Sequence, residues 1–446
     1  MAYDTTQMIP PEDPNRTQIG GPSPDIVPDP DRTAMASRVQ ALTLECIPEN
    51  RCALAPQTSR MHVLVRLTGT GAAMGARMPL NLCLILDRSG SMEGAPMDYM
   101  KRACSYVVDL LEPTDVLSVV AFEETAQVIM PARRVVNKAL IKEHINRLEV
   151  GNTTNLYDGI ALGASQVASI PAQGYVNRAL LFTDGEPTAG NKDFNSIVGQ
   201  VAEQKSRGIT VTALGFGSEY NEELLAAIAK RSGGNYYYIT RPELIPEVFR
   251  KELETLMLIV ARNLRMRVRM SRWVQVRQIY GKLPTFGHRT AEVTLADLER
   301  GEIETAIVEL ELGARPGGTY RVAKIEITYD DSVTARTETV EGDVVVEFTA
   351  APGLVAANVN PLVRREIEVA EASKSLERTV MGMRTQQVSP DEAVRELERT
   401  RALLLDQGKT LQAQDVQRAI DEIKGGAGAE KTLVGTIINL ERGKSK

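Results

Sequence analysis

The chain has 446 residues, of which 43% are hydrophobic and 25% are charged. This composition is typical of a globular protein, and the length suggests two or three domains. The formal net charge is −6 and the sequence contains no dense run of Lys and Arg, so nucleic acid is excluded as an expected partner.

The N-terminal segment, residues 1–35, is rich in Pro, Asp and Gly. It cannot bury enough apolar surface to offset the entropy of ordering, so it predicts a disordered tail. Two segments with alternating apolar residues follow, RVQALTLECI and MHVLVRLTG. Both patterns predict half-buried antiparallel strands.

From about Met78 apolar strands alternate with helices. The strand segments are PLNLCLILD, DVLSVVAFE, RALLFTDG, ITVTALGFG and NYYYI. The last helix is predicted over ELIPEVFRKELETLMLIV. Continuous apolar strands between helices indicate a parallel sheet with both faces covered. Residues 78–261 therefore predict an α/β unit with a Rossmann-like, doubly wound and mostly parallel sheet.

After Ala261 the apolar residues alternate with period two, from RNLRMRVRM to DVVVEFTA. This pattern predicts an antiparallel β-sandwich. Such a sandwich needs more strands than this half supplies, and the two N-terminal strands can complete it. We therefore expect a discontinuous sandwich, formed by residues 36–77 and 262–352, with the α/β unit inserted between its strands.

Helical patterns return at Pro361, and the segments up to residue 425 fit a small antiparallel bundle over 358–425. Ser389 before Pro390 is a typical N-cap with proline in the first turn. The stretch GGAGAE then leads to KTLVGTIINLERGKSK.

Two interpretations of this tail, residues 426–446, stay open. The tail is either a flexible peptide with Thr432 and Thr436 exposed as phosphoacceptors, or a final strand that docks on the sandwich.

The cysteines do not form a disulfide framework. Cys83 and Cys104 lie in an apolar strand and on an amphipathic helix pattern, so we expect them to be core thiols. Cys46 and Cys52 are close enough in sequence to pair, but one such pair is no framework. The three histidines are scattered, which argues against a histidine-based zinc site.

The sequence predicts no membrane span and no secretory signal. The N-terminal stretch MAYDTTQMIPPEDPN has neither a basic region nor an apolar run. The longest apolar candidate, LETLMLIVARNL, is shorter than the ~20 residues that cross a bilayer and contains charge. We therefore expect a cytoplasmic protein.

Polar residues follow two of the predicted parallel strands at their carboxyl ends. LILDRSGSMEG places Asp87, Ser89 and Ser91 after one strand, and RALLFTDG ends another with Thr183 and Asp184. The loop GNTTNLYDG adds threonine hydroxyls before a helix. Ligands of open parallel sheets bind at this edge. The donors are all oxygen atoms, the set that hard cations such as Mg²⁺ prefer.

These motifs resemble the von Willebrand factor A (VWA) family and its metal-ion-dependent adhesion site (MIDAS). DRSGS resembles the Asp-x-Ser-x-Ser motif, NTTN supplies the threonine and TDG the distal aspartate. The resemblance covers roughly residues 78–260. The flanking sandwich and bundle resemble larger bacterial intracellular proteins of the family.

The resemblance implies a metal site in which two serines and a threonine typically bind the cation directly and the aspartates often act through water. Its residues are Asp87, Ser89, Ser91, Thr154 and Asp184. Mg²⁺ is the expected cation, and Mn²⁺ or Ca²⁺ can substitute for it.

One position of this ligand set stays open. Thr153 can be the ligand in place of Thr154, although the context TNLYDG resembles the usual run of the family and favours Thr154. Asp158, in the same run, is expected either at the start of a helix or behind the ligands, rather than on the metal.

The resemblance implies a metal-dependent module that binds an acidic group on a partner protein, without catalysis. We expect an adaptor in a bacterial intracellular signalling or assembly complex, with Ser/Thr kinases, phosphatases or forkhead-associated proteins as partners. An alternative is an adaptor or co-chaperone for a MoxR-like AAA+ ATPase. Another alternative, a metal-dependent hydrolase, needs a base or nucleophile near the cation, and no histidine accompanies the motifs.

Overall fold

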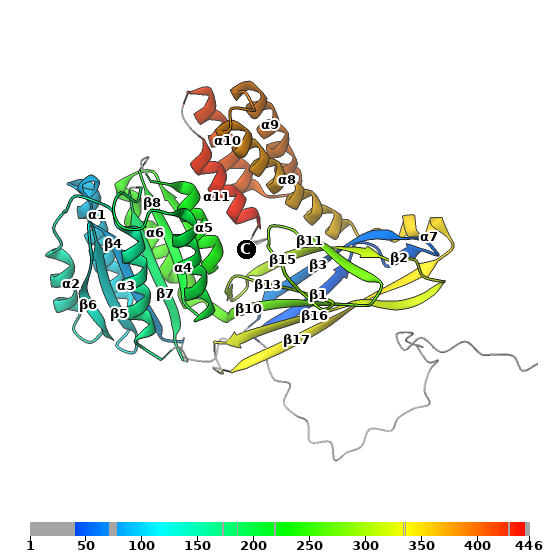
Figure 1. The fold of residues 1–446 in the computed structure, drawn as a ribbon, viewed down its shortest axis with the longest axis horizontal. Coiled ribbons are helices and arrows are strands. Elements are labelled where there is room, and N and C mark those ends of the chain that lie inside the picture. The colour runs from blue at the N-terminus through cyan, green and yellow to red at the C-terminus, as the bar shows by residue number, and fades with distance from the viewer. Residues whose placement is uncertain are drawn as a thin grey trace, which may run out of the picture.

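The structure is a computed structural model that describes residues 41–70, 78–171, 174–184, 186–217, 220–332, 334, 336–426 and 429–441. These residues form an α/β unit, a β-sandwich and a helical bundle (Figure 1). The disordered tail predicted over residues 1–35 lies outside the described residues. Within the described ranges, no helix has both the length and the apolar character that crossing a bilayer requires.

The α/β unit contains a six-stranded sheet with the strand order β6-β5-β4-β7-β8-β9. Its strands are β4 (Leu80–Asp87), β5 (Val116–Phe122), β6 (Ala126–Arg134), β7 (Val176–Thr183), β8 (Thr210–Phe216) and β9 (Tyr236–Ile239). Neighbouring strands are parallel except at β6, which runs antiparallel to β5. All residues of β4, β5, β7 and β8 are buried, which explains their continuous apolar sequences.

Helices cover both faces of this sheet. On one face lie α1 (Ala95–Leu110), α2 (Lys138–Asn146) and α6 (Ile245–Met257). On the other face lie α3 (Leu156–Ala168), α4 (Phe194–Ser206) and α5 (Glu222–Ser232). The short 3-10 helices are η1 (Gly90–Met92) and η2 (Pro242–Leu244). The doubly wound α/β fold predicted from the sequence is confirmed.

Two sheets form the sandwich, and their strands pair antiparallel except where β2 runs parallel to β17. The first has the order β1-β3-β15-β11 and the second β12-β13-β10-β16-β17-β2, with β14 on β10. The N-terminal strands are β1 (Leu42–Pro48), β2 (Cys52–Leu54) and β3 (Ser59–Gly69). The others are β10 (Ile259–Met270), β11 (Val274–Ile279), β12 (Thr285–Gly287), β13 (Thr290–Thr294), β14 (Leu298–Glu299), β15 (Ile303–Leu312), β16 (Gly318–Asp331) and β17 (Thr337–Thr349).

The sandwich is discontinuous in sequence. β3 pairs with β15 from Ser59↔Leu312 to Thr68↔Ile303, although the whole α/β unit lies between these strands in the chain. One hydrophobic core, which includes Val63, Val308, Val268 and Ile325, fills the space between the sheets. The α/β unit is therefore attached to the sandwich at both of its ends.

The sequence prediction was wrong for the end of the last α/β helix. The segment expected to be one helix is divided into η2, α6 and the beginning of β10. Ala261 pairs with Asp331 of β16, and both Val260 and Ala261 are buried in the sandwich core. β-Branched and small apolar residues fit either structure, and tertiary pairing decided between them.

The C-terminal part begins with the short helix α7 (Pro352–Ala357) and the long helix α8 (Pro361–Arg384). Two more helices complete the predicted antiparallel arrangement, α9 (Pro390–Asp406) and α10 (Thr410–Lys424). Ser389 caps α9 in a capping box with Glu392, as expected from the sequence. The first turns of α8 pack on the sandwich, where Val363 and Ile367 contact Leu64 and Ile307.

Both interpretations of the tail at 426–446 were wrong for the described part, because Glu430–Glu441 form a helix, α11. Leu433 is fully buried against α8, α9 and α10, so α11 is a fourth helix of the bundle. Thr432 and Thr436, expected to be exposed, are buried. Apolar residues at helical spacing outweighed the β-branched content that suggested a strand. Residues 442–446 lie outside the described part.

The four cysteines are free thiols, so the pairing considered for Cys46 and Cys52 is absent. Cys83 and Cys104 are core residues as predicted, and burial raises the pKa of each thiol to about 12.

Polar interactions link the bundle to the α/β unit. Arg384, at the end of α8, donates hydrogen bonds to Glu222 (2.8 Å) and Glu223 (3.0 Å) in the first turn of α5. α11 lies beside α5 and the edge strand β9 (Figure 1). The bundle therefore contacts both other parts of the molecule.

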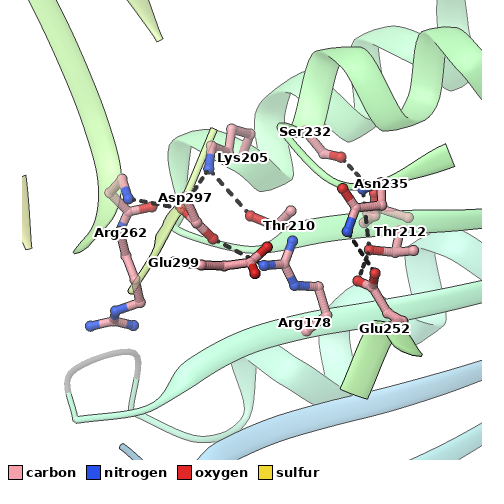
Figure 2. Close-up of polar contacts among 12 residues, drawn as sticks. Arg178, Lys205, Thr210, Thr212, Ser232, Asn235, Glu252, Arg262, Asp297 and Glu299 are labelled. Atoms are coloured by element: carbon pink, nitrogen blue, oxygen red, sulfur yellow. Dashed lines mark hydrogen bonds and ion pairs between the residues drawn. The ribbon is translucent and has the colours of Figure 1, made fainter. Parts of the chain in front are cut away.

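A buried ion cluster joins the α/β unit to the sandwich (Figure 2). Asp297 accepts a hydrogen bond from Arg178 at 3.0 Å, and the Lys205 ammonium lies 3.9 Å from its other oxygen. The amide of Asn263 also donates to this carboxylate. Burial alone would raise the pKa of Asp297, but the charges of Lys205 and Arg178 outweigh this effect and lower the pKa.

A second buried carboxylate, Glu252, holds α6 against the sheet. It accepts hydrogen bonds from Thr212 (2.6 Å) and Asn235 (2.6 Å) (Figure 2). The Tyr237 hydroxyl also donates to it, at 2.9 Å. Since α6 continues into β10 after a single residue, this network also helps to set the direction in which the chain enters the sandwich.

We predict that Leu433→Ala destabilises the protein by about 2–5 kcal/mol, because it leaves a cavity in the bundle core. Leu411→Ala is the control, since Leu411 is 72% exposed on α10 and should change stability little. Denaturant unfolding of the full chain, followed by circular dichroism, measures both effects. Equal stability of the two variants would mean that residues 430–441 do not pack as a core helix.

Candidate metal-binding edge of the parallel sheet

The predicted site residues lie at the carboxyl edge of the parallel sheet. β4 ends at Asp87, and its neighbour β7 ends at Thr183, directly before Asp184. Parallel pairing in register, Leu86 opposite Phe182, therefore brings the two aspartates to adjacent strand ends. Ser89 and Ser91 follow on the turn that forms η1.

Hydrogen bonds connect these side chains. The Ser91 hydroxyl donates to Asp184 Oδ1 at 2.8 Å, and the Ser89 hydroxyl lies 3.5 Å from the same oxygen. The two seryl oxygens are 3.1 Å apart. The structure thus gathers Ser89, Ser91 and Asp184 around one carboxylate oxygen.

Asp87 is anchored behind this group. The Ser89 amide donates to its Oδ1 at 2.8 Å, and the Thr183 hydroxyl donates to its Oδ2 at 2.5 Å. Burial raises the pKa of Asp87 to about 6, against the opposing effect of these hydrogen bonds, and the charge of Asp184 adds to the increase. Burial also raises the pKa of Asp184.

Thr154 is tied to the loop that follows Asp184. The Thr188 hydroxyl accepts a hydrogen bond from the Thr154 amide at 2.9 Å. The amides of Thr188 and Ala189 donate to the Thr154 carbonyl at 3.0 and 3.3 Å. These bonds use the backbone of Thr154, so its hydroxyl does not take part in them and can serve as a metal ligand. The third predicted loop therefore reaches the same edge.

Thr153, the alternative ligand, has a different environment. Its hydroxyl oxygen is buried and has no hydrogen-bond partner among the described residues. Buried hydroxyls are normally paired, so this oxygen is a second candidate donor in the loop. Thr153 and Thr154 are therefore both candidates for this position of the site.

Glu123, at the end of β5, organises the turn and the threonine loop and was missed by the sequence analysis. Its carboxylate accepts a hydrogen bond from Arg88 at 2.7 Å and from the Asn152 amide at 3.2 Å, and its carbonyl accepts from the Asn155 amide at 2.6 Å. A Cβ on Gly151 would meet this carboxylate at 1.8 Å, so a side chain there would displace the Glu123 carboxylate. The sequence analysis could not identify this role, because a single Glu that follows a strand forms no recognisable motif.

Asn155 caps α3 and positions the same loop. Its amide nitrogen donates to the Glu124 carbonyl at 2.9 Å and to Asp158 at 2.8 Å, and its side-chain oxygen accepts from the Asp158 amide. Asp158 therefore lies in the first turn of a helix, as expected. Gly190 has φ of +66° and approaches Asn155 so closely that a side chain there would clash.

We predict that Glu123→Ala loosens the threonine loop, because it removes charge-assisted hydrogen bonds worth about 1.5–3 kcal/mol each. Hydrogen exchange of the Gly151 and Asn152 amides should become at least about 10-fold faster. Glu124→Ala is the matched control, since Glu124 accepts a hydrogen bond from Asn155 through its backbone carbonyl, which the substitution keeps. Unchanged exchange in Glu123→Ala would show that the loop is held by other contacts.

Comparison with known proteins gives a family match for the α/β unit. The family model for the von Willebrand factor type A domain matches residues 81–251. The uncharacterized protein sll0103 of Synechocystis is 30% identical over 306 residues, which cover 66% of this chain and 72% of that protein. The uncharacterized protein YfbK of Escherichia coli is 28% identical over 270 residues, covering 58% of this chain but only 46% of YfbK.

Solved structures share the fold over most of the chain. A von Willebrand factor type A protein from Catenulispora acidiphila has a TM-score of 0.74 at 17% identity, covering 92% of this chain and 99% of its own. The ArnB paralog VWA2 from Sulfolobus acidocaldarius has a TM-score of 0.60 at 15% identity, covering 90% and 98%. The sequence relationship and the fold agree, and the chain belongs to the von Willebrand factor type A family.

Proposed function

We propose that the carboxyl edge of the sheet holds one divalent cation and that the protein uses this cation to bind an acidic side chain of a partner protein. VWA domains are commonly protein-interaction modules. The observation that carries the proposal is the convergence of Ser89 and Ser91 on Asp184 Oδ1, at 3.5 and 2.8 Å, with Asp87 on the adjacent strand.

The donor set fits a hard cation. The candidate ligands are all oxygen atoms, and Mg²⁺ is the preferred ion for such a set, with Mn²⁺ or Ca²⁺ as substitutes. The two aspartates are buried and both pKa values are raised, so bringing in positive charge would relieve an electrostatic cost. The residues that would hold the cation are Asp87, Ser89, Ser91, Thr154 and Asp184, with Thr153 as the alternative for Thr154.

When bound, the cation would supply a Lewis-acidic position for a carboxylate from outside. The chain's part is to keep the site open and polar. Thr183 and the Ser89 amide hold Asp87 in place, while Glu123 fixes the loops around the site. The hydroxyls that contact the two aspartates are weak bases, which favours binding over hydrolysis, and we propose that the chain is not an enzyme.

We further propose that the partner is a protein of an intracellular bacterial signalling or assembly complex, met in the cytoplasm. Ser/Thr kinases, phosphatases and forkhead-associated proteins are one class of candidates. A MoxR-like AAA+ ATPase, with this chain as its adaptor or co-chaperone, is the other. The contact of the bundle with both other parts supports an adaptor, because it fixes the bundle relative to the α/β unit that carries the proposed site.

We predict that Asp184→Ala weakens Mn²⁺ binding by about 100-fold in isothermal titration calorimetry, because the site loses its central oxygen. Glu186→Ala is the control, since Glu186 lies two residues further on and is not a proposed ligand. Thr154→Val should weaken binding and Thr153→Val should not; the reverse pattern would assign the open position to Thr153. Equal Mn²⁺ affinity of the wild type and Asp184→Ala would contradict the proposed metal site.

We predict that the full chain captures its partner from a cell extract in Mg²⁺ and releases it in EDTA. Ser89→Ala should capture none, while its unfolding midpoint stays within a few degrees of wild type, because the change is small and lies at a strand tip. Mass spectrometry of the bound proteins then separates kinase or phosphatase complexes from an AAA+ complex. Capture that persists in EDTA and in Ser89→Ala would show that binding uses another surface.

A further inference from the structure

A cavity of about 290 Å³ lies where the sandwich, the bundle and the α/β unit meet. Its walls are residues 278–283 at and after the end of β11, residues 305–307 of β15 and the α8 segment 366–377, with Lys230 of α5 and Leu440 of α11. Figure 1 shows the lower end of α11 beside β11 and β15 in this corner. Ligand pockets are often found at such domain junctions, with volumes of about 300–1,000 Å³.

The cavity contains a buried hydroxyl that the fold does not use. Ser373 of α8 is 4% exposed, and its oxygen has no hydrogen-bond partner among the described residues. Buried hydroxyls are normally paired, and a helical serine can usually bond the carbonyl four residues earlier. Ser373 therefore offers an unused donor and acceptor at the cavity wall.

Lys374 places a fixed positive charge beside it. Its ammonium donates to Gln278 Oε1 at 2.7 Å and lies 4.3 Å from the centre of the Tyr280 ring. The amide nitrogen of Gln278 donates a hydrogen bond to Glu309 Oε2 at 2.6 Å. These partners of Lys374 are neutral, and within the described residues no carboxylate lies at ion-pair distance from its ammonium.

The other charges of the wall include Lys282, which is paired with the buried Glu304 at 3.7 Å. Lys230, Glu366 and Glu377 also line the cavity. Lys374 differs from Lys282 because its hydrogen-bond partner, Gln278, is neutral, so its charge can meet an anion. The apolar wall includes Ile279, Ile307 and Val369. A ligand that suits this site has one anionic group and an apolar body.

We propose that this cavity binds a small organic anion with an apolar or aromatic body, whose anionic group contacts Lys374 and Ser373. Because the walls come from all three parts of the molecule, the occupied cavity holds the bundle on the sandwich and the α/β unit. The ligand site is separate from the carboxyl edge of the sheet and does not depend on a metal there.

The test uses the fluorescent probe anilinonaphthalenesulfonate and its neutral analogue phenylnaphthylamine, titrated into the full chain. We expect one saturable site for the anion and binding at least about 10-fold weaker for the neutral analogue, since a charge-assisted hydrogen bond is lost. Lys374→Met should weaken binding of the anionic probe by about 10-fold or more and leave binding of the neutral probe unchanged. Lys251→Met, an exposed lysine on α6, is the control and should change neither.

Ala370→Phe should abolish binding of both probes, because Ala370 lines the cavity and the ring would fill it. Ala356→Phe, at an exposed position on α7, should bind as wild type does. Thermal unfolding of each variant identifies any loss of fold, and Lys374→Met decides the question if Ala370→Phe does not fold. Absence of saturable binding, or affinities unchanged in Lys374→Met, would overturn the proposal.

Discussion

Asp297 holds the two larger parts of the molecule in a fixed relation. It belongs to the sandwich, and its buried carboxylate lies between Arg178 and Lys205 of the α/β unit. Removing one partner of such a buried group typically costs about 3–5 kcal/mol, because the opposite charges remain buried without compensation. The α/β unit is also attached through β3 and β10 at its two ends, so it cannot rotate freely on the sandwich.

This fixed relation also determines where the candidate metal site lies relative to the sandwich and the bundle. The carboxyl edge of the sheet, with Asp87 and Asp184, lies at the end of the unit away from the connections to β3 and β10. The bundle is held beside the same unit by Arg384 on Glu222 and Glu223. The bundle and the candidate site are therefore parts of one connected framework.

Periodicity predicted most elements because burial imposes it directly. β4 and β7 are buried on both faces and had to be apolar throughout, while β10 and β17 alternate because one face meets solvent. Periodicity failed where one segment suits two structures. Ile259–Ala261 continued a helical pattern but pair in the sandwich, and the segment at 430–441 looked like a strand or a flexible tail but packs as α11.

The sequence by itself determined the α/β class, the discontinuous sandwich pattern and the residues placed at the strand ends, since strand polarity alone carries Asp87, Ser89, Ser91 and Asp184 to one edge. Only the tertiary structure revealed the groups that hold this edge, such as Glu123, and the junction around Ser373 and Lys374. The physical reason is distance along the chain: Arg178 and Asp297 are 119 residues apart, and no local pattern records which distant side chain a buried charge will meet.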